Sequence, residues 1–303
     1  MLTNWTLSDD NLFRVARVGG TLFLLLMGFN VFGNGIIILT TLRSPNLRSP
    51  CHVFIAIQAF TDIGTTLGHP LFVYYAYSET FITFKTCFWY MFLPNSCMNC
   101  TTFLLLCIGV DRYIGTKYVI WYKSLPRVRY ILCILFGCFF YDFLLKVGGY
   151  LTTNDGRVLC LVPEGLASKG KDIWVASQIA INVTVIVIYQ KIKKNIRNCN
   201  GAAKHSDPRR IFASLYLIQA CYIFGWATTM VLLGIQMVLT DNMNVMVACE
   251  SIVGLFANIN LAIPFLVYYT RSTLYRVEFR RLFGVIPGRV GYVESAVFTT
   301  ENT

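Results

Sequence analysis

The chain has 303 residues, of which 55% are hydrophobic and only 14% are charged. This balance is far more apolar than that of an average soluble domain, and a single soluble core rarely extends over so many residues. Composition therefore argues against a soluble enzyme or binding module and favours a protein that crosses a membrane several times.

Seven apolar stretches are long enough to cross the hydrocarbon layer, which takes roughly 17–25 residues of helix. The sequence therefore predicts an all-α membrane protein, a seven-transmembrane helix bundle. The fifth stretch is the weakest because Ser177, Gln178 and Asn182 interrupt it, and we expect its helix to continue into water over 191–197. In chain order the stretches cover residues 18–42, 53–77, 86–113, 128–151, 173–189, 211–239 and 245–270.

The distribution of basic residues predicts the orientation. Of the 26 lysines and arginines, 19 fall in segments that are inside if the amino terminus is outside, and six fall in the outer segments. This is the positive-inside bias, and it accounts for the net charge of +11 without a nucleic-acid partner. We expect an extracellular tail over 1–17, a transmembrane domain over 18–270, and a cytoplasmic surface helix with a disordered tail over 271–303.

The first residues show no pattern of a cleavable signal peptide, so we expect the first stretch to act as a signal anchor. Asn4-Trp5-Thr6 is an N-glycosylation sequon on the predicted outer side. The sequons at Asn99 and Asn182 lie inside apolar stretches, where glycosylation does not reach. Over 271–283, Tyr275 and Phe279 fall on one helix face, which predicts an amphipathic helix on the inner leaflet.

Eleven cysteines do not form a disulfide framework, because most lie inside apolar stretches or in inner segments. Cys87, at the outer end of the third stretch, and Cys160, in the outer loop 152–172, face an oxidising compartment, and we predict a bond between them. This bond would pull the loop over the third helix as a lid on any outer cavity. Cys97 and Cys100 are spaced as CxxC but lack supporting histidines, so no metal site is predicted.

The third stretch ends in Asp111-Arg112-Tyr113. Ionisable residues are costly at a membrane helix, and the long stem of Arg112 allows its guanidinium to reach water. In one hypothesis, Arg112 is a switch: an acid binds it in the resting state, and a partner protein binds it in the active state. In the other, Arg112 only anchors the helix at the membrane interface. Asp111 lacks the i,i+4 spacing for a helix-face pair. Asp207 is either the holding acid or the cap of the sixth helix.

Asp62 lies midway along the second stretch, where an ionised carboxylate needs partners or an ion. Asn34, Asn258 and Asn260 lie at matching depths in the first and seventh stretches. The group is either a polar centre filled by water or a sodium ion, or a static hydrogen-bonded contact between helices. No other cofactor is expected.

A candidate ligand pocket in the outer half comprises His69, Trp226 and Glu250. His69 and Glu250 either contact a ligand or form interhelical hydrogen bonds. Trp226 either forms the floor of the pocket or only packs at a helix interface. Asp142 and Lys146 share a face of the fourth helix, so they either pair or Lys146 extends outward.

At these residues the chain resembles the rhodopsin-like superfamily of G-protein-coupled receptors, and more closely the nematode serpentine chemoreceptors of the Srsx class. The resemblance covers about residues 32–283. It is carried by Gly33-Asn34, Leu42-Arg43-Ser44, Leu47-Arg48-Ser49-Pro50-Cys51, Asp62 with Gly68-His69, Cys87-Phe88, Ile108-Gly109-Val110-Asp111-Arg112-Tyr113, Phe224-Gly225-Trp226 and Tyr268-Tyr269-Thr270-Arg271-Ser272.

The resemblance implies a multi-pass protein of the plasma membrane, in sensory-neuron cilia or other neurons, that couples to a heterotrimeric G protein. Asp111 and Arg112 match the family's switch, and Trp226 matches its sixth-helix aromatic. Two features depart from the superfamily pattern: Tyr268 lies one residue further from Pro264, and no proline follows Trp226. The usual hinge of the sixth helix and the usual tyrosine toggle are therefore not assured.

The sequence thus predicts a receptor, not an enzyme, that binds an extracellular small molecule or peptide and promotes nucleotide exchange on a G protein. The alternative is a seven-span channel or transporter subunit without G-protein coupling, although neither repeated halves nor broken midplane helices are apparent. A retinal protein is disfavoured because the seventh stretch has no lysine.

Overall fold

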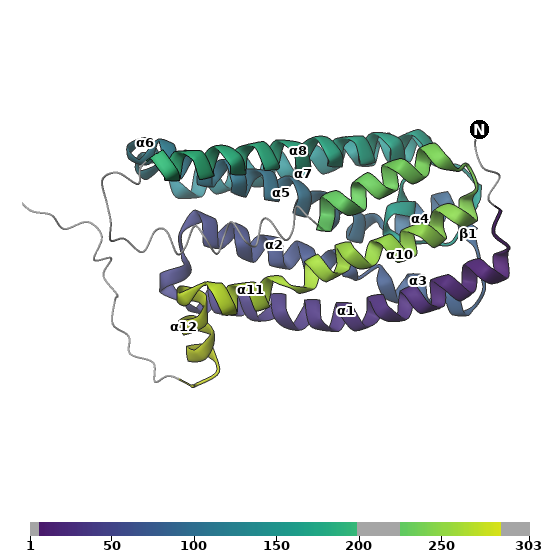
Figure 1. The fold of residues 1–303 in the computed structure, drawn as a ribbon, viewed down its shortest axis with the longest axis horizontal. Coiled ribbons are helices and arrows are strands. Elements are labelled where there is room, and N and C mark those ends of the chain that lie inside the picture. The colour runs from purple at the N-terminus through teal and green to yellow at the C-terminus, as the bar shows by residue number, and fades with distance from the viewer. Residues whose placement is uncertain (1–5, 199–224, 286–303) are drawn as a thin grey trace, which may run out of the picture.

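The computed structural model describes residues 6–198 and 225–285, and its helices run side by side along the long axis of the molecule (Figure 1). The helices are α1 (Asp9–Arg43), α2 (Pro50–Thr66), α3 (His69–Tyr77), α4 (Phe84–Tyr90), α5 (Phe92–Lys117), α6 (Val119–Ser124), α7 (Arg127–Thr152), α8 (Ser168–Asn198), the helix Gly225–Leu239, α10 (Met243–Ala262), α11 (Pro264–Arg271) and α12 (Thr273–Leu282).

Five helices of the described chain are long and apolar enough to cross a membrane, namely α1, α5, α7, α8 and α10. The bounds of α7 lie within one residue of those predicted, and α8 extends beyond 189 as expected. Helix α1 begins at Asp9, earlier than predicted, because Ser8 caps it and Asp9 and Asp10 favour its first turn. Part of the expected tail is therefore helical.

The second stretch was predicted as one continuous helix, but the structure shows two helices there. Helix α2 ends at Thr66 and α3 begins at His69, because Pro70 has no N–H for the carbonyl of Thr66. Pro264 separates α10 from α11 in the same way, and Met91 separates α4 from α5. The sixth stretch is described only over Gly225–Leu239; Asn4 and Asp207 lie outside the described residues.

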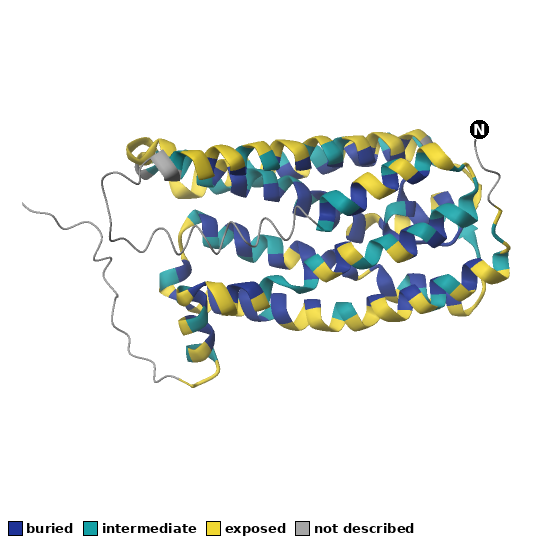
Figure 2. Cartoon of the chain, in the orientation of Figure 1, coloured by how far each residue is buried: buried dark blue, intermediate teal, exposed yellow. Residues whose placement is uncertain are grey.

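The helices pack so that α1 contacts α2, α3 and α10, while α5 lies between α2, α7 and α8. Large apolar side chains remain exposed on the outward faces of these helices (Figure 2), including Phe136, Phe139, Phe140 and Phe143 of α7. A soluble monomer rarely exposes a patch of this kind. Such an apolar surface suits contact with lipid.

One end of the bundle is closed by the loop between α7 and α8. Strand β1 (Ile82–Thr83) pairs antiparallel with β2 (Arg157–Val158), and Cys87 is disulfide-bonded to Cys160. The loop continues through the short helix η2 (Val162–Gly165). Leu159 and Leu161 of this loop are buried. The predicted disulfide and the predicted lid are thus both present.

The opposite end carries α6, α12 and the short helix η1 (Pro45–Leu47), and α12 turns away from the bundle axis after α11 (Figure 1). Tyr275 and Phe279 of α12 are buried, and the ring of Tyr275 lies 4.6 Å from that of Tyr268. A helix is thus present where one was predicted over 271–283, and it covers Thr273–Leu282.

Replacement of Cys160 by serine tests the role of the closed loop. Removing a native disulfide costs about 2–4 kcal/mol, so we expect Cys160→Ser to lower the apparent Tm of the purified protein. Cys133→Ser is the control, because Cys133 is an exposed free cysteine of α7. Equal Tm values for both variants and the unmodified protein would show that the disulfide does not hold the loop.

Candidate functional site

Asp111 and Arg112 form a buried ion pair at the end of the bundle that holds α6 and α12. Asp111 is fully buried, whereas the Arg112 side chain is 18% exposed. The Arg112 Nε donates to Asp111 Oδ2 at 2.9 Å, and Nη2 donates to the same oxygen. The two residues lack i,i+4 spacing, and they pair because the long arginine side chain folds back onto its neighbour.

Tyr122 of α6 completes the arrangement, although no sequence pattern indicated this role. Its hydroxyl donates to Asp111 Oδ1 at 2.7 Å and lies 3.5 Å from Arg112 Nη2. Burial and the Asp111 carboxylate raise the pKa of Tyr122 above its ordinary value, so the phenol remains a donor. Tyr113 takes no part: its hydroxyl accepts from Lys117 Nζ at 3.2 Å. Asp111, Arg112 and Tyr122 thus form a hydrogen-bonded contact between α5 and α6.

A second polar cluster surrounds Asp62 in the middle of the bundle. The Thr101 hydroxyl of α5 lies 3.1 Å from Asp62 Oδ1 and 2.7 Å from Thr61 Oγ1. Asn34 does not bond to the Asp62 side chain. It donates to the Leu261 carbonyl at 2.9 Å and to Asn30 Oδ1.

Asn30, which the sequence argument overlooked, connects this cluster to α2. Its amide donates to the Asp62 carbonyl at 2.9 Å and to Thr66 Oγ1 at 3.1 Å. A cavity of about 20 Å³ lies beside the cluster, and its lining includes Asn34, Asp62 and Asn260. Three of the four predicted residues therefore meet at one cavity.

Asn258 is the one predicted residue that does not line this cavity, since it bonds to His69. Its Oδ1 lies 2.6 Å from His69 Nε2, and its amide donates to the Gly254 carbonyl at 2.9 Å. Asn260 lies against Gly225, where an added Cβ would approach its Nδ2 within 1.5 Å. Gly225 thus permits the close approach of its helix to α10.

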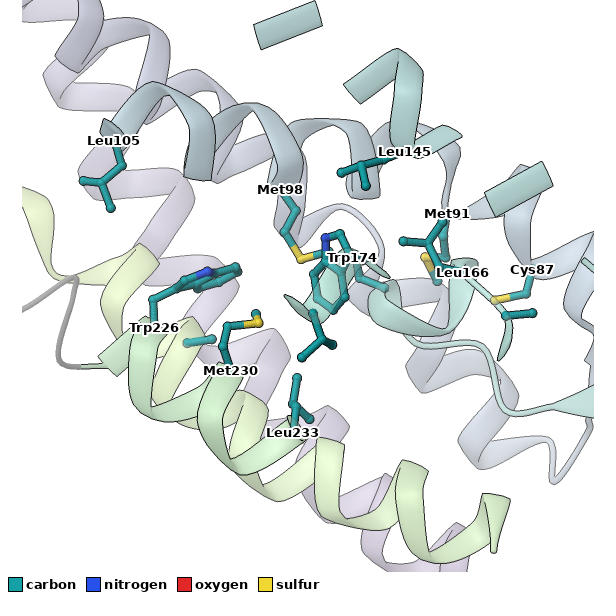
Figure 3. Close-up of a cluster of buried hydrophobic side chains, with 14 of the residues drawn as sticks. Cys87, Met91, Met98, Leu105, Leu145, Leu166, Trp174, Trp226, Met230 and Leu233 are labelled. Atoms are coloured by element: carbon teal, nitrogen blue, oxygen red, sulfur yellow. The ribbon is translucent and has the colours of Figure 1, made fainter. Parts of the chain in front are cut away.

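A cavity of about 60 Å³ lies toward the closed end, and His69, Trp226 and Glu250 all line it. Figure 3 shows Met98 and Trp174 close to Trp226, Met230 and Leu233, which all belong to one buried cluster. The three candidate residues, from α3, α10 and the helix Gly225–Leu239, therefore share one space. Trp226 also donates from Nε1 to Gln178 Oε1 of α8 at 3.2 Å.

Glu250 belongs to a buried charge cluster that sequence reasoning missed. Lys171 Nζ lies 2.5 Å from Glu164 Oε1 and 2.5 Å from Glu250 Oε1, and all three side chains are at most 5% exposed. Lys171 is one of the six basic residues of the predicted outer segments. In the sequence, only the position of Glu250 inside the seventh apolar stretch indicated that a basic partner was needed.

Asp142 and Lys146 do not pair, and Lys146 does not extend outward. Asn99 donates to Asp142 Oδ1 at 2.7 Å, while Lys146 Nζ donates to Asn95 Oδ1 at 2.8 Å. Trp174 Nε1 donates to Asn99 Oδ1 at 2.9 Å. The two asparagines of α5 therefore join α7 to the wall of the 60 Å³ cavity, which includes Trp174.

Comparison with known proteins now decides the family. The model of the serpentine-type seven-transmembrane G-protein-coupled chemoreceptors, Srsx, matches residues 27–283. The chain belongs to the Srsx chemoreceptor family. This family consists of receptors and not of enzymes.

More distant relatives of this Srsx chain are also G-protein-coupled receptors. It is similar to human olfactory receptor 4A8, with 29% identity over 38% of the chain and 36% of that receptor. It is 21% identical to human C-C chemokine receptor type 4 over 65% of the chain and 57% of the receptor. The elephant (Elephas maximus) alpha-2B adrenergic receptor is 31% identical over 62% of the chain and 52% of that receptor. The matches thus cover about a third to three fifths of these relatives.

Tyr122→Phe tests whether the hydroxyl helps to hold Arg112 in this Srsx receptor. The change removes one donor to Asp111, so we expect faster nucleotide exchange on the G protein without added ligand. Tyr118→Phe is the control, because Tyr118 is half exposed and makes no contact with Asp111. An unchanged basal rate for Tyr122→Phe would contradict a holding role.

Thr101→Val tests the polar cluster, because it removes the hydroxyl that α5 presents to Asp62. Interhelical hydrogen bonds in membranes contribute about 1 kcal/mol each, so we expect the apparent Tm to fall by about 2–4 °C. Thr184→Val, at an exposed position of α8, should leave the Tm unchanged. A Thr101→Val protein as stable as the unmodified one would show that Asp62 does not depend on this contact.

Proposed function

We propose that this Srsx-family chain is a chemosensory receptor with seven membrane spans, its amino terminus outside and its carboxyl terminus inside. The charge distribution and the family support this topology. The observation that carries the function is the Asp111–Arg112–Tyr122 contact at the proposed inner end of α5. A guanidinium held by a buried acid at this position is suited to release toward a cytosolic partner.

The mechanism is a shift between two populations of the helix bundle. In the resting bundle, Asp111 occupies two donors of Arg112, and Tyr122 fixes Asp111 from α6. Separation of the inner ends of α5 and α6 would break this contact and expose the guanidinium. A heterotrimeric G protein that binds exposed Arg112 then stabilises the active bundle, and nucleotide exchange follows.

The ligand site is the outer cavity between α3, α10 and the helix Gly225–Leu239. This helix supplies Trp226, Met230 and Leu233 to the cavity wall. A ligand bound in the cavity would therefore contact the helix directly. Trp226 is also bonded to Gln178, so displacement of Trp226 changes a contact with α8. The ligand enters as an extracellular small molecule or peptide.

The cavity beside Asp62 fits a sodium ion. Asn34 Oδ1 is buried without a donor among the described residues, and the Asp62 carboxylate lines the same cavity. Oxygen ligands of this kind suit a hard cation. Bound there, the ion would neutralise Asp62 and would hold α1 and α2 together in the resting bundle.

The site of action is the plasma membrane, and sensory-neuron cilia suit a chemoreceptor. The basic inner segments favour contact with an anionic leaflet. Exposed arginines there, such as Arg127 and Arg129, lie on the same side as Arg112 in this topology. They provide matched controls for it.

Guanine-nucleotide exchange in membranes that carry the receptor and a panel of G proteins tests the proposal. Pooled organic and peptide extracts serve as the ligand source. We expect Arg112→Ala to reduce exchange to the rate of receptor-free membranes, while Arg129→Ala exchanges as the unmodified receptor does. Exchange that survives Arg112→Ala, or no exchange with any G protein despite folded receptor at the cell surface, would contradict it.

A further inference from the structure

Glu250, which lines the outer cavity, belongs to a buried cluster of two acids and one lysine, a formal excess of one negative charge. Two carboxylates, Glu164 and Glu250, share a single ammonium, that of Lys171. Removing one unbalanced charge from water is costly. The second oxygen of each carboxylate, Oε2, has no hydrogen-bond donor among the residues that the structure describes. Of these two acids, Glu250 lines the cavity.

A second unsatisfied acceptor lies in the same wall. The Asn258 amide nitrogen donates to the Gly254 carbonyl, so its oxygen is left to accept from His69 Nε2–H. In the neutral imidazole, Nδ1 is then an acceptor, and within the described chain it has no partner. His69 and Glu250 both line the cavity, and each has a buried acceptor without a donor among the described residues, His69 Nδ1 and Glu250 Oε2.

The rest of the lining selects the kind of donor. Metal cations such as Ca²⁺ take several oxygen ligands, whereas here the wall is mainly apolar. Phe23, Trp174 and Trp226 present aromatic rings, and such rings attract an organic ammonium. With about 60 Å³, the cavity has room for roughly four to six water-sized groups at 10–15 Å³ each.

We propose that the outer cavity binds a small aliphatic ammonium ion. Its N–H groups donate to Glu250 Oε2 and His69 Nδ1, and its alkyl chain packs against the aromatic wall. The positive charge completes the cluster of two carboxylates and one lysine. This inference deepens the proposed function and rests on it, since it names the ligand class of the same cavity.

Thermal unfolding of the purified full-length receptor tests binding without any G protein. The probe is n-butylammonium chloride, and the controls are 1-butanol, which has the same shape without the charge, and sodium chloride at equal ionic strength. We expect n-butylammonium alone to raise the apparent Tm, by about 2–4 °C near saturation. Equal shifts with 1-butanol, or no shift at all, would overturn the proposal.

Matched variants locate the site. Glu250→Gln should abolish the shift, whereas Glu278→Gln, which changes a buried acid of α12 outside the cavity, should retain it. If Glu250→Gln does not fold, Lys171→Ala replaces it: with the internal ammonium gone, n-butylammonium should stabilise this variant more than the unmodified receptor. A shift that survives Glu250→Gln, or a Lys171→Ala shift no larger than that of the unmodified receptor, would contradict the assignment.

Nucleotide exchange separates this inference from the function on which it rests. A Tm shift that depends on Glu250, without exchange on any G protein, would confirm the amine site and contradict coupling. Exchange driven by other extract components, with no Tm shift from n-butylammonium, would support the receptor and overturn the amine site.

Discussion

The structure depends on one constraint: a polar group inside an apolar layer must find its partner within the protein. Several buried polar residues consequently join two elements. Asn30 joins α1 to α2, Thr101 joins α5 to α2, and Asn99 joins α5 to α7. Apolar side chains gain little by facing one another instead of lipid. The polar contacts therefore help to set which helices are neighbours and at what depth.

Helix α5 runs through all three sites. Met98 lines the outer cavity, Thr101 contacts Asp62, and Asp111 holds Arg112. At 1.5 Å per residue, Met98 and Asp111 lie roughly 20 Å apart along this helix. A ligand and a G protein would thus act on opposite ends of one rigid element. The polar cluster around Asp62 lies between the outer cavity and the Arg112 site. A rearrangement of α2 against α5 at this cluster would therefore change contacts at both sites.

The sequence predicted what depends on local pattern. Long apolar runs located the helices, Tyr275 and Phe279 located α12, and the positions of Cys87 and Cys160 located the disulfide. Continuity was predicted less well: the second stretch was expected as one helix, whereas the missing N–H of Pro70 divides it into α2 and α3. The polar residues of the sites were found because a charge or amide in an apolar run stands out.

Their partners were mostly not found, because partners are set by packing between helices far apart in the chain. Asn258 bonds to His69 and not to Asp62, a difference of helix rotation that spacing does not reveal. Lys171, near the start of α8, looks like an ordinary surface lysine until Glu164 and Glu250 are brought against it. Tyr122 gave no signal, since an aromatic residue in an inner loop is common.

The central inference is that Asp111 holds Arg112 at rest and that activation separates them. The most direct measurement is an experimental structure of the receptor bound to its nucleotide-free G protein, compared with the receptor alone. The account predicts an Asp111–Arg112 contact in the free receptor, and in the complex an Arg112 that has left Asp111 and lies against the G protein. An Arg112 that keeps its bond to Asp111 in the complex would contradict it.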